Sequence, residues 1–304
     1  MIKLTIGVSV VIPSFNNKQK LFRLLNSVQK SNYPNLEIIV VDNSPSSEIL
    51  KSGRSVFKNV KWVDLGRENL GQTTSYNIGF SNAKRGNHIL YCDEDVIVAK
   101  DMIRYLVERA ESSEVIGIVT PMVLYLENKN WVNQAGAEVN LKTGRVTIGW
   151  GPRKNFLKAK KVQGSGTVML FKNSVLKKIG GFEDWFMCYF DPEYCVRALK
   201  AGFENWYEPK AVCYHDQPMD STKWRPRVLS RAYLLGRNRT LFMRKYGNMF
   251  IYTLFLPILL GYYLIESIKF KIFGKWIELV RGTIVGYTYK NSTKLYVPLP
   301  INKK

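Results

Sequence analysis

Residues 89–98 read Ile-Leu-Tyr-Cys-Asp-Glu-Asp-Val-Ile-Val, so three acids interrupt an apolar pattern that is typical of buried strands. Alternate side chains of an extended chain share a face, which predicts that Asp93 and Asp95 point together and that Glu94 points away. In proteins, Mg²⁺ takes one or two carboxylates, several waters and the oxygens of a substrate phosphate. The triplet is therefore a candidate metal–diphosphate site, with an acidic surface turn as the alternative.

The segments before this triplet predict an α/β fold. Short β-branched apolar runs predict strands buried on both faces, and apolar residues at helical spacing predict helices between them. The predicted strands are residues 6–12, 36–41, 60–65 and 88–92, and the predicted helices are residues 18–29 and 71–82. Strands and helices that alternate at this spacing indicate a Rossmann-like, mostly parallel sheet with helices on its faces.

Polar residues follow three of the predicted strands. Residues 13–16, Asp42 and residues 93–95 fall at carboxyl ends, where parallel α/β sheets bind their ligands. The sequence excludes two other nucleotide-binding patterns. No Gly-x-Gly-x-x-Gly follows the first strand, residues 164–166 have no third glycine in register, and no Gly-x-x-x-x-Gly-Lys-Ser/Thr loop occurs.

Basic residues are concentrated toward the carboxyl terminus. The 304 residues have a formal net charge of +21, and residues 221–304 contain 16 Lys and Arg against two acids, a net +14. Such a patch suits a polyanion, either a nucleic acid or an anionic membrane surface. The four cysteines form no Cys-x-x-Cys pair, which favours buried free thiols in a reducing compartment. Residues 1–5 lack the layout of a signal peptide.

Motifs along residues 6–245 resemble the family 2 glycosyltransferases, which are inverting enzymes of the GT-A fold. Their order and spacing carry the resemblance, and the closest likeness is to the rhamnosyltransferase-like branch that extends lipid-linked glycans. The motifs are Val-Val-Ile-Pro-Ser-Phe-Asn at 10–16, Ile-Ile-Val-Val-Asp-Asn-Ser at 38–44, Asn-Leu-Gly at 69–71, the acidic triplet, Gly-Gly-Phe at 180–182, Tyr-Phe-Asp-Pro-Glu-Tyr-Cys-Val-Arg-Ala at 189–198, Tyr-His at 214–215 and Gly-Arg-Asn-Arg at 236–239.

The resemblance implies a donor site and a cofactor. Asp42 would hydrogen-bond the pyrimidine base of a UDP- or dTDP-sugar, and Asp93 and Asp95 would hold Mg²⁺ or Mn²⁺ on the diphosphate. A divalent cation stabilises the charge that develops on a departing diphosphate, which supports this assignment independently. His215 is a third candidate metal ligand, with a structural role as the alternative. The nucleotide would also be lined by Pro13, Ser14, Phe15, Asn16, Asn69, Gly71 and Asn77.

Inversion needs a base opposite the leaving group, to take the proton of the acceptor hydroxyl. The family places it on the aspartate of a Glu-Asp pair that opens a helix, and here Phe190 precedes Asp191, so only Asp191 matches. Pro192 fits the first helical position with Asp191 as the N-cap, and capping alone is the alternative role for Asp191. Glu193 is the alternative base.

Residues 131–171 correspond to the acceptor side of the family. Strand-like pieces at 137–140, 146–150 and 162–171 are separated by glycines, and another strand is expected at 211–214. Aromatic side chains here suit sugar stacking, although they are equally typical of a core. The candidate acceptor residues are Trp150, Gly164, Trp185 and Tyr189.

The carboxyl-terminal region predicts membrane association. Residues 246–265 are uncharged over the length of a membrane span, but Pro257 interrupts them and basic clusters stand on both sides, against the positive-inside rule. We expect helices embedded in the membrane surface or a re-entrant hairpin, with a hairpin packed on the catalytic domain or across a homodimer as the alternative. Apolar residues then recur at helical spacing, as in a helix lying in the membrane interface: Ile268, Ile272, Trp276, Leu279 and Ile284.

The sequence thus predicts a nucleotide-sugar-binding half at 1–98, an acceptor-binding half at 99–220 and a basic, membrane-associating region at 221–304. The leading prediction is a metal-dependent inverting glycosyltransferase at the cytoplasmic face of the cell membrane, acting on a hydroxyl of a lipid-linked or other glycan. A polyprenyl-phosphate sugar synthase is the alternative enzyme. A nucleic-acid-binding protein is disfavoured, because the charges accompany aliphatic runs rather than a polar groove with stacking aromatics.

Overall fold

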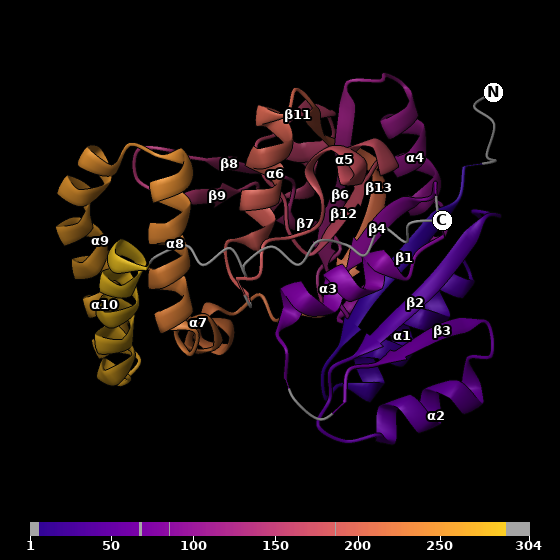
Figure 1. The fold of residues 1–304 in the computed structure, drawn as a ribbon, viewed down its shortest axis with the longest axis horizontal. Helices are drawn as coiled ribbons and strands as arrows, with labels where there is room; N and C mark the ends of the chain where they lie inside the picture. The colour runs from indigo at the N-terminus through magenta and orange to yellow at the C-terminus, as the bar shows by residue number, and fades with distance from the viewer. Residues whose placement is uncertain (1–5, 67–68, 85, 186, 290–304) are drawn as a thin grey trace.

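The computed structural model describes residues 6–66, 69–84, 86–185 and 187–289. The sequence predictions for residues 1–5, and for the last 15 residues of the 221–304 region, therefore lie outside the described residues. Helices cover a large central sheet, and three long helices stand together at one end of the molecule (Figure 1).

Four parallel strands form the amino-terminal half of the sheet. They lie in the order β4-β1-β2-β3, and connecting helices return the chain between them. The predicted strands and helices of this half are confirmed to within two residues, and α2 is additional. The bounds are β1 Val8–Ser14, α1 Lys18–Gln29, β2 Leu36–Asp42, α2 Glu48–Val56, β3 Val60–Asp64, α3 Gln72–Ser81 and β4 His88–Cys92.

The second half extends the same sheet with mixed pairing. Strand β12 lies antiparallel between β4 and β6, whereas β13 runs parallel to β6. The predicted piece at 162–171 is a strand only from Val168, because Gly164 bridges to Ala137 and Thr167 turns the chain at φ 60°. The strands are β5 Val96–Val98, β6 Ile116–Tyr125, β7 Trp131–Gln134, β10 Gly151–Pro152, β11 Lys160–Lys161, β12 Val168–Phe171 and β13 Glu204–His215, with β8 Ala137–Val139 and β9 Val146–Ile148 as a separate pair.

Each face of the sheet is covered by its own helices. Leu21 and Leu25 of α1 and Leu106 of α4 (Met102–Glu111) are buried against one face. Helices α3, α5 (Asn173–Ile179) and α6 (Phe190–Lys200) cover the other face. A short 3-10 helix, η1 (Arg153–Phe156), follows β10. Burial on both sides explains the continuous apolar runs of the central strands.

The last four helices are α7 (Ser221–Leu229), α8 (Ala232–Tyr246), α9 (Met249–Lys269) and α10 (Phe273–Thr288). Helix α10 approaches α8 closely at glycines. A Cβ atom on Gly236 would lie 2.3 Å from the carbonyl oxygen of Leu279, and one on Gly282 would lie 2.0 Å from that of Tyr233. Helices α9 and α10 lie beside each other, since the indole N–H of Trp276 donates to the carbonyl of Leu260 (2.9 Å).

Helix α9 is long and apolar enough to cross a membrane, judged by length and composition. It continues through Pro257, so that proline does not end the helix as the sequence suggested. The predicted single apolar face from Ile268 to Ile284 is wrong, because the chain breaks at Lys271 (φ 55°) and the two residues lie on different helices. The outward apolar side chains of the two helices are Phe250, Leu254, Ile258, Tyr262, Ile265, Ile268, Phe273, Ile277 and Ile284.

Candidate active site

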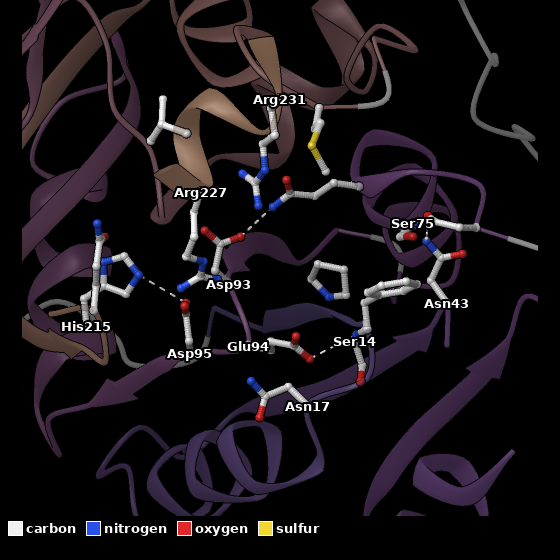
Figure 2. A pocket seen from close by; sticks show the side chains of 17 residues that line it. Ser14, Asn17, Asn43, Ser75, Asp93, Glu94, Asp95, His215, Arg227 and Arg231 are labelled. Atoms are coloured by element: carbon white, nitrogen blue, oxygen red, sulfur yellow. Dashed lines mark hydrogen bonds and ion pairs between the residues drawn. The ribbon is translucent and has the colours of Figure 1, made fainter. Parts of the chain in front are cut away.

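A cavity of about 520 Å³ lies beyond the carboxyl ends of β1, β2 and β4, under the corner between α7 and α8 (Figure 2). Parallel strands end at one edge of the sheet, which brings together motifs that are far apart in the chain. The lining residues are Pro13, Ser14, Phe15, Asn17, Asn43, Asn69, Gln72, Ser75, Asp93, Glu94, Asp95, Met187, His215, Gln217, Arg227, Val228 and Arg231.

All three acids of the triplet line this cavity. Glu94 therefore does not point away as predicted, and its Oε2 accepts a hydrogen bond from the backbone N–H of Phe15 (3.1 Å). The reason is a turn at Glu94 and Asp95: strand β5 does not continue β4 but pairs antiparallel with β13. The alternation expected of an extended chain is lost at that turn.

Burial and mutual repulsion disfavour charge on two of these acids. Burial, followed by the charge of Asp95, raises the pKa of Asp93 to about 6. Burial raises the pKa of Glu94 to about 8. Asp93 Oδ1 accepts hydrogen bonds from Gln72 Nε2 and from the Tyr76 hydroxyl, each at 2.8 Å. A cluster of this kind is stabilised by a cation that supplies the missing positive charge.

Asp95 faces His215 across the same cavity. His215 Nε2 lies 3.2 Å from Asp95 Oδ1 (Figure 2). His215 Nδ1 lies 3.0 Å from Asn133 Oδ1. Because an amide oxygen only accepts, Nδ1 donates to Asn133. Nε2 donates to Asp95 when the ring is doubly protonated, and presents a lone pair to the cavity when the ring is neutral. Burial opposes ionisation of Asp95, but the hydrogen bond and charge of His215, with Lys20, lower its pKa below the usual value.

This pair fits a divalent cation. Adjacent ligands of an octahedral ion with bonds of about 2.1 Å lie about 3.0 Å apart, close to the 3.2 Å between Asp95 Oδ1 and His215 Nε2. The described part of the chain contains no group of three His, Cys, Asp or Glu side chains that encloses an ion. An ion that also binds a diphosphate needs only one or two protein ligands, so Asp95 and His215, with Asp93 nearby, suffice.

The predicted nucleotide residues divide into two groups. Pro13, Ser14, Phe15 and Asn69 line the cavity with Asp93, and Phe15 is 43% exposed. The remaining four do not line it: Asn16, Asp42, Gly71 and Asn77.

Three of those four form hydrogen bonds within the loops and backbone near the cavity. Asp42 is buried and accepts the backbone N–H of Ser44 (3.2 Å). Asn77 holds the backbone of Phe182 through both of its amide atoms. The N–H of Gly71 donates to Asn69 Oδ1 (3.0 Å), which fixes the side chain that does reach the cavity.

The sequence analysis missed Asn43, Gln72 and Ser75, which line the cavity. Asn43 Nδ2 donates to Asn69 Oδ1 (2.9 Å), so two neighbouring loops are joined beside the acidic triplet. The signal was present for Asn43, which directly follows Asp42 in the second strand-end motif.

A second cavity, of about 510 Å³, adjoins the first and shares lining residues with it: Gln72, Asp93, His215, Gln217, Val228 and Arg231. Asp191 lines this second cavity. Its further lining comes from Tyr91, Tyr125, Asn133, Gln134, Ile148, Trp150, Gly166, Thr167, Cys188 and Phe190.

Asp191 is the second residue of α6, and Tyr189 holds the N-cap position. The prediction that Asp191 caps the helix is therefore wrong, because the helix begins at Phe190 after a left-handed Tyr189. Burial, with a smaller contribution from the charge of Asp93, raises the pKa of Asp191 to about 7. Gly166 leaves room for this carboxylate, since a Cβ there would lie 2.5 Å from Asp191 Oδ2.

Glu193, the alternative base, is fully buried and lines neither cavity. Its carboxylate binds Arg197 (3.0 Å), Lys245 (3.0 Å) and the hydroxyl of Tyr246 (2.5 Å). These contacts join α6 to the end of α8, and they direct the carboxylate away from the cavities.

Among the predicted acceptor residues, only Trp150 lines the second cavity. Trp150 is 54% exposed, and its indole N–H donates to the hydroxyl of Tyr125 (3.2 Å). Trp185 and Tyr189 are buried in the packing of α6 and α8. Gly164 bridges to β8.

The opposite wall of the first cavity is basic. Arg227 and Arg231, at the corner between α7 and α8, project toward the acidic triplet (Figure 2). Among the described residues neither guanidinium forms an ion pair. The charge of Arg231 acts on Asp93, where it opposes the rise in pKa caused by burial. The sequence analysis did not find these residues, since they belong to no motif.

The model of a protein family described as "Glycosyltransferase like family 2" matches residues 6–232, most of the chain. The chain belongs to this family. Among curated family 2 relatives, the poly-beta-1,6-N-acetyl-D-glucosamine synthase of Staphylococcus epidermidis is 27% identical over 212 residues, 68% of this chain and 49% of the relative. The chain thus spans about half the length of that synthase. The low-salt glycan biosynthesis hexosyltransferase Agl10 of Haloferax volcanii is 24% identical over 91% of this chain and 89% of its own.

Solved structures confirm the GT-A fold. GalNAc-T7 with UDP, GalNAc and Mn²⁺ superposes with a TM-score of 0.58 at 19% identity, over 70% of this chain and 44% of that one. The mannosyltransferase PcManGT of Pyrobaculum calidifontis, in complex with GDP-Man and Mn²⁺, gives 0.55 at 14% identity, over 93% and 88%. The sequence prediction of a family 2 glycosyltransferase with a GT-A fold is therefore confirmed.

Proposed function

We propose that this chain is a metal-dependent inverting glycosyltransferase that moves a sugar from a nucleoside-diphosphate donor, UDP- or dTDP-linked by preference, to a hydroxyl of a lipid-linked or other glycan. One observation carries the proposal. Two adjoining cavities place a carboxylate with a pKa of about 7, Asp191, beside a compartment that contains three acids and a histidine. Neighbouring structures solved with Mn²⁺ and a nucleotide or nucleotide sugar support it.

The donor would occupy the first cavity. Phe15 offers an exposed ring to the base, and Asn43 and Asn69 offer amide groups to the base or ribose. Asp95 and His215, with Asp93, would hold Mg²⁺ or Mn²⁺, which would supply positive charge to the diphosphate. Arg227 and Arg231 would reach the same phosphates from the opposite wall, where guanidinium groups form strong charge-assisted hydrogen bonds.

The acceptor would occupy the second cavity, with a sugar ring against Trp150. The acceptor hydroxyl gives its proton to Asp191 as its oxygen attacks the anomeric carbon, while the bond from that carbon to the diphosphate oxygen breaks on the other side. A base with a pKa near 7 is ionised in about half of the molecules at neutral pH and still accepts a proton efficiently. Attack opposite the leaving group inverts the anomeric configuration.

The alternative is a polyprenyl-phosphate sugar synthase, in which a lipid phosphate is the nucleophile. Such a phosphate is already ionised and needs no base, so this reaction would not use a carboxylate with a raised pKa at Asp191. Family membership leaves no support for the alternative of a nucleic-acid-binding protein. The rhamnosyltransferase-like branch remains a proposal that rests on the sequence motifs.

The test combines thermal stability with product analysis. UDP, dTDP and GDP are each added with Mn²⁺, Mg²⁺ or a chelator, and unfolding is followed. A UDP- or dTDP-sugar that stabilises the protein is then incubated with glycan acceptors, and the anomeric configuration of the product is read by NMR. Equal stabilisation with a chelator present would refute metal dependence, and retained configuration would refute inversion.

We also propose that the protein is peripheral or monotopic at the cytoplasmic face of the membrane. The outward faces of α9 and α10 expose a stripe of large apolar side chains, including Phe250, Leu254 and Ile258. Lys269, Lys271 and Arg281 are exposed near the same faces. Apolar insertion combined with basic side chains suits an anionic bilayer surface.

Flotation with vesicles of neutral and anionic lipid, over a salt series, tests this localisation. The wild-type chain should float with anionic vesicles at low salt, and the double substitution Leu254→Glu and Ile258→Glu should prevent flotation. If the wild-type chain ignores such vesicles but sediments as a dimer that the same substitutions dissociate, the stripe is a homodimer interface instead.

A further inference from the structure

The turn before α6 is bonded to Asn238, a side chain of α8. Asn238 is fully buried, and the two N–H groups of its Nδ2 are shared among three carbonyl oxygens, those of Trp185 (3.1 Å), Met187 (2.5 Å) and Cys188 (3.0 Å). Its Oδ1 accepts from Nε of Arg237 (2.8 Å), which fixes the orientation of the amide.

This turn has a backbone conformation that its residues do not favour. Cys188 and Tyr189 are consecutive non-glycine residues with φ of 64° and 63°. A Cβ atom in this left-handed region is crowded by the following carbonyl, so such residues persist only where their surroundings hold them. The three carbonyl contacts of Asn238 are such a restraint, since they act on the peptide groups that define the turn.

A second attachment supports the same turn. The hydroxyl of Tyr189 donates to the carbonyl of Gly144 (2.6 Å) and accepts from Nε of Arg239 (2.6 Å). Nη2 of Arg239 donates to the hydroxyl of Tyr263 on α9 (3.2 Å). The guanidinium is buried, and its carbon lies 5.5 Å from the centre of each tyrosine ring.

The turn leads directly into the candidate base. Asp191 follows Tyr189 by two residues and lies in the first turn of α6, with its Oδ2 against the backbone of Gly166. The direction in which α6 leaves the turn therefore sets the position of the carboxylate in the second cavity. Movement of the turn would displace Asp191 without touching the acidic triplet or the arginine wall.

We propose that Asn238 is a positioning residue for Asp191, so that the carboxyl-terminal helices form part of the catalytic machinery and are not a detachable membrane anchor. The inference rests on the proposed function, in which Asp191 is the base. It gives the Arg-Asn pair of the Gly-Arg-Asn-Arg motif at 236–239 a physical role.

The experiment replaces Asn238 by Asp in the full chain. The carboxylate has the same shape but no N–H to donate, so the carbonyls of the turn lose their partner. We expect kcat to fall about 10²-fold, because misplacement of a reacting group by about 1 Å costs about that much. The KM for the donor, and the stabilisation by UDP with Mn²⁺, should stay within about twofold of wild type, because Met187 is the one residue of this turn in the described lining of the first cavity and the polar groups proposed for the donor lie on other elements.

Thr240→Val is the matched control. Thr240 is equally buried on α8, and its hydroxyl contacts Gly236 and Tyr252 but not the turn. This variant should lose thermal stability and keep kcat. If Asn238→Asp does not fold, Asn238→Ser replaces it, with the same expectation.

A double variant provides a measurement that would not change if Asn238 served only the stability of the fold. Cys188→Gly in the Asn238 variant should restore part of the lost kcat, because glycine adopts positive φ without steric cost. Normal kcat in Asn238→Asp, or an equal loss of kcat in Thr240→Val at equal loss of stability, would overturn the inference. If Asp191→Asn itself retains turnover, the assignment of the base fails, whereas normal kcat in the Asn238 variant alone refutes only the positioning role.

Discussion

The two walls of the first cavity carry opposite charge and have different origins. The acidic wall, residues 93–95, comes from the end of a central parallel strand, and its site follows from the strand pattern. The basic wall, Arg227 and Arg231, comes from a helix corner more than 130 residues later in the chain. Functional side chains at the end of a strand can be located from the local sequence. Functional side chains on a helix that packs over the site can be located only from the tertiary structure.

The largest expected effect tests Asp191, the proposed base, which lines the adjoining second cavity. Asp191→Asn should lower kcat by about 10²–10⁴, the usual contribution of a positioned general base. Donor binding, measured by titration of UDP with Mn²⁺, should be retained because the donor contacts lie in the other cavity. Near-normal turnover would exclude Asp191.

Glu193→Gln is the control for this substitution. It should lower thermal stability markedly, because Arg197 and Lys245 would lose their buried partner, an effect of about 3–5 kcal/mol in other proteins. Turnover of the folded variant should remain. The opposite pattern, a stable variant without turnover, would transfer the role of the base to Glu193.

The next prediction concerns the binding of a divalent cation at the acidic wall. Asp95→Asn should abolish the part of UDP stabilisation that depends on Mn²⁺, because the amide no longer balances the charge of the ion. In the wild-type chain this ligand at 100 times its dissociation constant should add about 2.7 kcal/mol to the free energy of unfolding. His215→Gln should give a smaller loss in the same assay. Unchanged metal-dependent stabilisation in both variants would refute the site.

Arg227 and Arg231 should contribute less to donor binding than the metal ligands do. Their contribution should not require a metal ion. Arg231→Gln or Arg227→Gln should raise the KM for the donor about tenfold each, which is the usual worth of a hydrogen bond to a charged group. Arg225→Gln is the matched control, since Arg225 stands on the same helix but pairs with Glu266 of α9 (2.9 Å). An equal rise in KM for the control would show a general effect of charge instead of contact.

The last prediction is a pH dependence of stability. The pKa of Asp191 is about 7 in the folded chain and about 3.8 when unfolded, so its favourable contribution is present below pH 3.8 and is lost as pH rises through 7. Asparagine is neutral throughout. Asp191→Asn should therefore raise Tm at pH 8 but not at pH 4, by roughly 2–4 °C for each kcal/mol. If the variant and the wild type have equal Tm at both pH values, Asp191 is hydrated and its pKa is not perturbed.

Local sequence predicted the amino-terminal half well, because a strand buried on both faces needs a continuous apolar run. The interruption of that run at residues 93–95 marked the site. The same logic failed at the turn of Glu94, because the period of two holds only while the chain remains extended. It also misplaced the start of α6 by two residues, because the helix follows a left-handed Tyr189 in a turn that contacts Asn238 and Arg239 of α8.

The acceptor residues were the least predictable part of the site. Trp150, Trp185 and Tyr189 have the same character in sequence, yet only Trp150 reaches the cavity. The other two fill the contact between α6 and α8, which no local pattern describes. The division of the chain at residue 221 remains a prediction, although α8 packs against the turn that precedes Asp191.

The glycine contacts between α8 and α10 determine in which solvents these two helices keep their arrangement. At Gly236, Gly282 and Gly286 the backbones meet directly, so close van der Waals contact, and not the expulsion of water, joins the pair there. Such a joint has similar strength in water and in hydrocarbon. The outer surface of α9 can therefore exchange one solvent for the other while the helices behind it keep their arrangement, so the proposed binding to a bilayer would not require the enzyme to refold.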